Sequence, residues 1–157
     1  MTLDQIVDDF IRTRRESADA DLREFRKLPS LNHAIGHGAL CHWLPEIKRH
    51  PHQYRIPAPL LHAAERRLQR AAGTLLSAPN FEALHDAIYR RIRWKGIGSL
   101  TIYDIAQRIG AFLGKAPRLV YLHRGTRIGA RRFGFTGDTL DPGSLPPAFS
   151  RLRPAEI

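Results

Sequence analysis

The chain has almost no cysteine and no long apolar run. Cys41 is the single cysteine among 157 residues, so no intramolecular disulfide can form. A lone thiol fits a reducing compartment, and we expect a cytoplasmic protein. No apolar run is long enough to cross a bilayer, so no membrane partner is expected. The acidic, amphipathic N-terminus, MTLDQIVDDF, is unlike a secretory signal.

Acidic residues are scarce in one part of the chain. The sequence has 25 Lys and Arg against 15 Asp and Glu, a formal net charge of +10. Residues 1–24 carry seven acids and four arginines, whereas residues 87–134 carry eleven Lys or Arg and one acid, Asp104. A localised positive field favours a phosphate polymer as partner, because each neutralised phosphate releases counterions. With 43% hydrophobic residues the chain is globular, not a disordered basic tail.

Apolar residues recur mostly at helical spacing. The pattern predicts an all-α fold, a compact multi-helix domain with one helical hairpin, and no internal repeat. We expect a single domain over residues 1–157. Its expected parts are N-terminal helices over 1–47, an irregular basic loop over 48–59, a helical region over 60–134 with the hairpin at 94–101, and a turn-rich segment over 135–157.

Particular residues mark where helices begin. Thr2, Ser30 and Asn80 precede apolar-periodic runs and are expected N-caps, since their side-chain oxygens can accept from free backbone N–H groups. The string LVYLH at residues 119–123 fits a short strand or a helical turn. We prefer the helical turn, followed by a helix that Thr126 caps.

The hairpin is the most informative segment. Gly96-Ile97-Gly98 joins an apolar helix ending near Ile92 to another that begins after Ser99. Two glycines can expose consecutive backbone N–H groups, while the isoleucine between them plugs the helix junction. Those N–H groups lie at a helix N-terminus, where unpaired donors and the helix dipole favour a phosphate. We therefore expect the N–H groups of Gly96, Ile97, Gly98 and Ser99 to bind the phosphates of one strand.

Basic side chains lie on either side of this turn in the sequence. Arg93 and Lys95 precede the glycines. Arg124, Arg127 and Arg131 follow farther along the chain, the last two in the helix that Thr126 is expected to cap. Binding through such groups is largely independent of base sequence and strongly dependent on salt. DNA is the expected partner and RNA the alternative, because the pattern does not distinguish them.

Two helices joined by Gly-hydrophobic-Gly resemble the helix-hairpin-helix, and residues 80–134 are distantly similar to the endonuclease III-like DNA glycosylases. In that family the hairpin reads roughly L-P-G-V-G-x-K-T-A, and a V-D-T-H loop and a basic helix follow. Here Val120-Tyr121-Leu122-His123 aligns with V-D-T-H. The resemblance implies DNA binding, with a monovalent cation at the hairpin; no other cofactor is expected. The strings GIGSLTIYD and YLHRGTR also resemble those of small bacterial proteins of unknown activity.

The sequence departs from the glycosylases where their chemistry resides. Leu100 occupies the position of the family's lysine and cannot form a Schiff base. Tyr121 occupies the position of the family's aspartate, and four cysteines for an iron–sulfur cluster are lacking. These departures argue against the usual glycosylase mechanism.

Two alternatives to a nucleic-acid-binding protein stay open. One is a divergent glycosylase-like or metal-independent nuclease-like enzyme that uses His50, His52, Tyr121 and His123, because paired histidines beside cations can bind phosphate and transfer protons. The other is a protein-interaction module, in which the acidic N-terminal helix docks on a basic partner.

Five of the eight histidines lie between residues 33 and 52. His33 and His37 are four apart and would share a helix face, as zinc ligands can. No carboxylate or second cysteine completes a closed site, so we expect no bound metal and histidines that are hydrogen-bonded or exposed.

Overall fold

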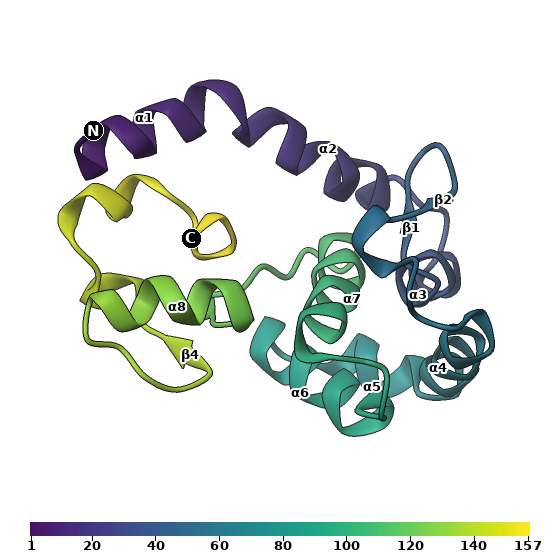
Figure 1. The fold of residues 1–157 in the computed structure, drawn as a ribbon. Coiled ribbons are helices and arrows are strands. Elements are labelled where there is room, and N and C mark those ends of the chain that lie inside the picture. The colour runs from purple at the N-terminus through teal and green to yellow at the C-terminus, as the bar shows by residue number, and fades with distance from the viewer. The chain divides into compact units, whose positions relative to one another are not determined.

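The structure is a computed structural model that describes residues 1–157, apart from the side chain of His52. In this described part, 63% of the residues are helical, in eight α-helices and several short 3₁₀ helices (Figure 1). Two pairs of two-residue antiparallel strands complete it. The expected all-α fold class is confirmed. No helix in this part is long and apolar enough to span a membrane.

The elements have the following bounds. The α-helices are α1 Leu3–Thr13, α2 Arg15–Arg26, α3 Leu31–Ala39, α4 Ala58–Arg70, α5 Ala72–Ser77, α6 Phe81–Ile92, α7 Ser99–Phe112 and α8 Arg124–Arg132. The strands are β1 His42–Trp43, β2 Lys48–Arg49, β3 Val120–Tyr121 and β4 Thr139–Leu140. The 3₁₀ helices are η1 Pro51–Gln53, η2 Pro142–Ser144, η3 Pro147–Arg151 and η4 Pro154–Glu156.

The chain divides into two compact units. The terminal unit consists of residues 1–19 and 117–157, and the central unit of residues 20–116. The central unit has fifteen Lys or Arg against seven Asp or Glu, and the terminal unit ten against eight. Eight of the ten net positive charges therefore belong to the central unit, which also contains the hairpin. The expectation of one domain over residues 1–157 stays a prediction.

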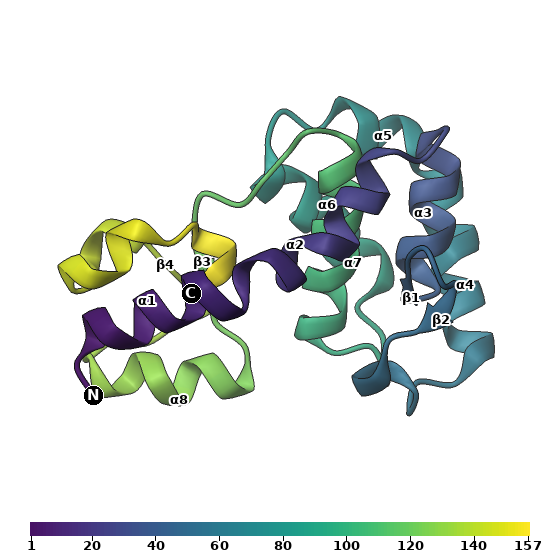
Figure 2. The same ribbon diagram turned by 90° about the horizontal axis from the view of Figure 1, so that it is seen from above.

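The core of the central unit fixes both helices of the hairpin. α7 packs against α3 and α6, and α4 also packs against α3 and α6 (Figure 2). Leu84, Ile88 and Ile92 of α6 are fully buried at helical spacing, as are residues 102, 105 and 109 of α7. Burying each such side chain stabilises the folded unit by about 1.5–3 kcal/mol. Packing of α6 and of α7 on the rest of the core therefore fixes the orientation of the two hairpin helices.

Side-chain caps start three helices as expected. Asn80 Oδ1 accepts from Ala83 N at 2.9 Å, which begins α6. Ser30 Oγ accepts from His33 N at 3.4 Å, and Thr2 Oγ1 accepts from Gln5 N at 3.3 Å. All three predicted N-caps are confirmed.

The segment 48–59 is partly regular. It comprises β2, η1 and the first residues of α4, which begins at Ala58. β1 pairs antiparallel with β2, with Trp43 opposite Lys48 and His42 opposite Arg49.

In the terminal unit, residues 119–123 differ from the predicted helical turn. Val120 pairs with Leu140 and Tyr121 with Thr139, so this string contains a strand, and the preferred helical turn was wrong. The strand forms by pairing with residues 139–140. Local periodicity does not reveal this partner, because it is distant in sequence. Thr126 is not the N-cap of α8, since the helix begins at Arg124; its Oγ1 instead accepts from His123 N at 2.7 Å.

Candidate functional site

The hairpin loop connects α6 to α7 in six residues and turns at Gly96. The backbone of Gly96 has a φ of +100°, a conformation that L-residues rarely adopt. Ile97 is only 4% exposed, so its side chain is buried beneath the turn. Its N–H donates to Trp94 O at 3.0 Å. Of the four backbone amides expected to bind phosphate, that of Ile97 is therefore already hydrogen-bonded within the loop.

Gly98 is the N-cap residue of α7, and the start of this helix is open. No side chain caps the helix among the described residues, and its first turn holds no acidic residue. A Cβ built on Gly98 meets no atom within 4 Å, and Gly98, Ser99 and Leu100 are all exposed. Their N–H groups lie in the first turn, where a helix supplies no acceptor. The turn can therefore present three neighbouring amides to an anion.

Two exposed cations lie beside this turn. Arg93 and Lys95 are exposed, and no carboxylate in the described part of the chain forms an ion pair with either. The Arg93 guanidinium lies 5.1 Å from the centre of the Tyr89 ring. Trp94, between the two cations in sequence, is half-buried and has the Arg67 guanidinium 6.0 Å from its ring centre. Its ring is thus covered in part by Arg67.

The three predicted binding arginines of α8 belong to the terminal unit. Arg127 donates from Nε to Leu122 O at 3.1 Å and forms an ion pair with Asp138. Its guanidinium is therefore engaged inside this unit. Arg124 and Arg131 are exposed on the same helix.

The four candidate catalytic residues are divided between the units. His50 belongs to the central unit, where its ring stacks on Trp43 with 5.6 Å between centroids. Tyr121 and His123 belong to the terminal unit. Burial, and secondarily the positive charge of Arg127, lower the pKa of His123. The side chain of His52 lies outside the described part of the structure.

The histidines of α3 have different partners from those their spacing suggested. His33 Nδ1 hydrogen-bonds with Ser30 Oγ at 2.8 Å, whereas His37 Nδ1 lies 3.1 Å from Nδ1 of His42 in β1. Burial is the main cause that lowers the pKa of both His37 and His42. In the described residues, no group of three or more His, Cys, Asp or Glu side chains is arranged to hold a metal ion.

A buried glutamine fastens η1 to the second helix of the hairpin. Gln53 is 1% exposed, and its Nε2 donates to Asp104 Oδ2 at 2.8 Å. Asp104 lies in the second turn of α7, past the open N-terminus. Sequence reasoning did not identify Gln53, because nothing in a proline-rich polar segment marks one glutamine as buried.

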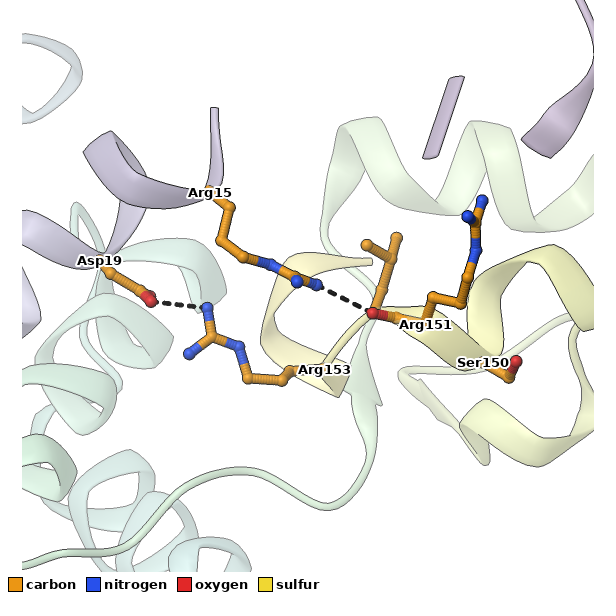
Figure 3. A pocket seen from close by; sticks show the side chains of 6 residues that line it. Arg15, Asp19, Ser150, Arg151 and Arg153 are labelled. Atoms are coloured by element: carbon orange, nitrogen blue, oxygen red, sulfur yellow. Dashed lines mark hydrogen bonds and ion pairs between the residues drawn. The ribbon is translucent and has the colours of Figure 1, made fainter. Parts of the chain in front are cut away.

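The terminal unit contains an open pocket of about 420 Å³ (Figure 3). Arg15, Asp19, Arg151 and Arg153 line it, but its arginines already have partners. Arg15 Nη2 donates to Arg151 O at 2.8 Å, and Arg153 Nη2 lies 2.7 Å from Asp19 Oδ2 (Figure 3). Glu156 pairs with both Arg15 and Arg153. The pocket is therefore lined by an ion-pair network between residues 15–19 and residues 153–156. Sequence spacing could not reveal this network, because its members are far apart in the chain.

A scan against known protein families gave no match for this chain, and comparisons with curated proteins and with solved structures gave none either.

Proposed function

We propose that this protein binds the sugar–phosphate backbone of nucleic acids, largely independently of sequence, through the open N-terminus of α7 and the turn before it. The observation that carries the proposal is a glycine at position 98, where the backbone does not require one. Gly98 has φ −83° and ψ 168°, which any residue adopts.

A different residue would stabilise this helix better. Ser, Asp and Asn are favoured N-caps because their side chains accept from the first-turn N–H groups. At Gly98 there is also room for a side chain, since nothing lies within 4 Å of the Cβ position. Glycine leaves the amides of Gly98, Ser99 and Leu100 uncovered and lets another backbone approach closely. A phosphate would satisfy those donors and the positive end of the helix dipole.

The charge distribution supports the same ligand. The central unit carries most of the net positive charge of the chain, and Arg93 and Lys95 flank the turn without carboxylate partners in the described residues. Such a field attracts a polyanion and makes binding fall steeply with salt. DNA is the proposed partner, and RNA is the alternative.

Gly98→Asp gives a sharp test, because it separates binding from stability. The aspartate caps α7 and places a negative charge over the proposed phosphate site. Affinity for a short DNA duplex should fall about ten-fold or more at low salt, because charge-assisted hydrogen bonds are lost. The free energy of unfolding should stay equal or rise by up to about 1 kcal/mol.

The matched control is Gly73→Asp on α5. Gly73 is also exposed, and its Cβ position is also free within 4 Å. This variant adds the same charge to the same unit and should lose much less affinity. If Gly98→Asp binds duplex as tightly as the wild type, the hairpin is only structural and the proposal is wrong.

A further inference from the structure

Two aromatic side chains are exposed on the central unit outside the hairpin. Trp43 in β1 is 45% exposed, and Tyr54, directly after η1, is 61% exposed. We call Trp43 and Tyr54 the aromatic surface, because Lys48 lies opposite Trp43 in the strand pair and within electrostatic range of Tyr54. Aromatic rings normally contribute to stability by burial, so leaving two of them in solvent forfeits that contribution.

His50 and Lys48 lie beside Trp43; the Lys48 ammonium pairs with Glu46 at 3.0 Å, so the cation available at this surface is Arg55. His50 stacks on the Trp43 ring at an interplanar angle of 24°, so one face of the indole is covered by the imidazole. Lys48 lies opposite Trp43 in the strand pair. Its pKa is raised by a hydrogen bond from its ammonium to Glu46 and, more weakly, by the nearby Tyr54. Arg55 follows Tyr54 and is exposed.

The tip of the β1–β2 hairpin adds strain at the same place. Ile47 has a φ of +52°, which is costly for a β-branched residue, and the residue is 58% exposed. A turn that served only to connect two strands would favour Gly or Asn at this position. Both the strain and the exposure of apolar area suggest that this surface meets a ligand.

The aromatic surface and the hairpin are linked through short, packed connections. Gln53, the residue before Tyr54, hydrogen-bonds to Asp104 of α7. Leu60, six residues after Tyr54, packs beside Gly96. The segment that carries Tyr54 is therefore packed against both α7 and the turn at Gly96 within the same unit.

We infer that the aromatic surface stacks unpaired bases of the nucleic acid whose backbone the hairpin binds, so that the preferred ligand contains a single-stranded segment. This inference rests on the proposed function. Stacking on aromatic rings tolerates any base, and adjacent cations bind the connecting phosphates. In a continuous duplex the base faces are covered by neighbouring base pairs. Arg55, an exposed cation directly after Tyr54, favours a nucleic acid over an apolar protein segment as the occupant.

The test compares three ligands of one base sequence: single-stranded DNA, single-stranded RNA and duplex DNA. Trp43→Ala should lower affinity for the single strands about ten-fold or more, and Tyr54→Ala by less, while duplex affinity stays unchanged. Trp43→Phe keeps a ring and should retain most of the affinity. The two single-stranded ligands show whether the sugar matters.

Tryptophan fluorescence gives a direct readout, because the chain has only two tryptophans, Trp43 and Trp94. In the Trp94→Phe protein, Trp43 is the only tryptophan, and its fluorescence should be quenched by a single strand and not by the duplex. An unchanged signal with a bound single strand would overturn the inference. So would equal losses for duplex and single strands in Trp43→Ala, or a surface that binds apolar peptide in place of single strands.

The two proposals fail separately. Gly98→Asp should weaken binding of all three ligands, whereas Trp43→Ala should weaken binding of single strands only. If Gly98→Asp has no effect and Trp43→Ala remains selective, the hairpin proposal is wrong, and Trp43 stacks on bases of a nucleic acid that the hairpin does not bind. If Gly98→Asp acts and Trp43→Ala does not, backbone binding stands and base stacking is wrong.

Discussion

Leu60 Cδ2 lies 2.9 Å from the position that a Cβ at Gly96 would take. The φ of +100° at Gly96 adds backbone strain for any L-residue. Gly96→Ala should therefore destabilise the central unit by about 1–2 kcal/mol, chiefly through the backbone, since Leu60 can shift. Gly98→Ala should change the free energy of unfolding by no more than about 0.5 kcal/mol. Urea denaturation followed by tryptophan fluorescence measures both, because Trp43 and Trp94 are in the central unit. Equal stabilities for the two variants would contradict this account of the turn.

Arg108 is a buried cation whose compensation comes from Asp21. The Arg108 side chain is 5% exposed, and its Nε lies 3.1 Å from Asp21 Oδ2. The other carboxylate oxygen of Asp21 accepts from Leu44 N at 3.1 Å. Asp21→Ala leaves the guanidinium buried without its anion and should cost about 3–5 kcal/mol.

Replacing both members tests whether the cost comes from an uncompensated charge. The double variant Asp21→Ala with Arg108→Met should recover stability relative to Asp21→Ala alone, because an apolar chain of similar length then fills the site. Chemical denaturation of the two variants and the wild type gives the comparison. A double variant less stable than Asp21→Ala would show that packing on Phe25, not charge, dominates at Arg108.

Helix starts could be predicted from the sequence, because capping depends on residues within one turn. Pairing partners that are distant in sequence could not be predicted. Asn80, Ser30 and Thr2 act within one turn of their own position, so their capping roles could be inferred from residue type and spacing. Residues 120–121 form a strand only because residues 139–140 pair with them. No periodicity over five residues carries that information.

The same distinction holds for the candidate site. The Gly-Ile-Gly spacing predicted exposed glycines around a buried isoleucine, and the exposures of residues 96–98 agree with it. The pairing of His37 with His42 was missed, because it depends on the chain reversing after α3. Trp43 and Tyr54 were missed as well, since exposure of an aromatic ring is decided by packing that residue type alone does not reveal.

His37 and His42 should make the central unit sensitive to mild acid. Burial lowers the pKa of both below 6.5; the His33 charge adds to the shift at His37 and the His37 charge to that at His42, while Glu65 opposes it. The unfolded chain therefore takes up protons first as the pH falls. Stability is complete above about pH 6.5 and declines as the pH drops from there through the lower folded pKa values. Denaturation of the central unit at about pH 7.5 and about pH 5.5 measures the loss.

Variants assign that loss to the pair. His42→Gln should reduce the difference in unfolding free energy between the two pH values. His62→Gln should leave the difference unchanged, because His62 is exposed on α4. Equal pH dependence in the wild type and His42→Gln would show that other groups titrate in this range.

Glu156 should make the terminal unit sensitive to stronger acid. Burial alone would raise its pKa, but hydrogen bonds from Arg153 and Arg15 outweigh burial and lower it from 4.5 to about 2. Arg15 reaches the carboxylate from Nε at 2.8 Å and from Nη2 at 3.0 Å. Because the folded pKa is the lower one, the stabilisation is present above about pH 4.5 and is lost as the pH falls towards 2.

Glu156→Gln removes the charge and keeps the shape of the side chain. It should lower the stability of the terminal unit by about 1–3 kcal/mol at neutral pH, since the arginines it compensates are partly exposed and screened. It should also flatten the acid dependence below about pH 4.5. Amide NMR signals of residues 117–157 followed through urea denaturation report on this unit, which contains no tryptophan. Asp86→Asn, which breaks the exposed pair with Arg90 in the central unit, is the control and should leave these signals unchanged. An acid transition of the terminal unit that is the same in Glu156→Gln and the wild type would place the titrating carboxylate elsewhere.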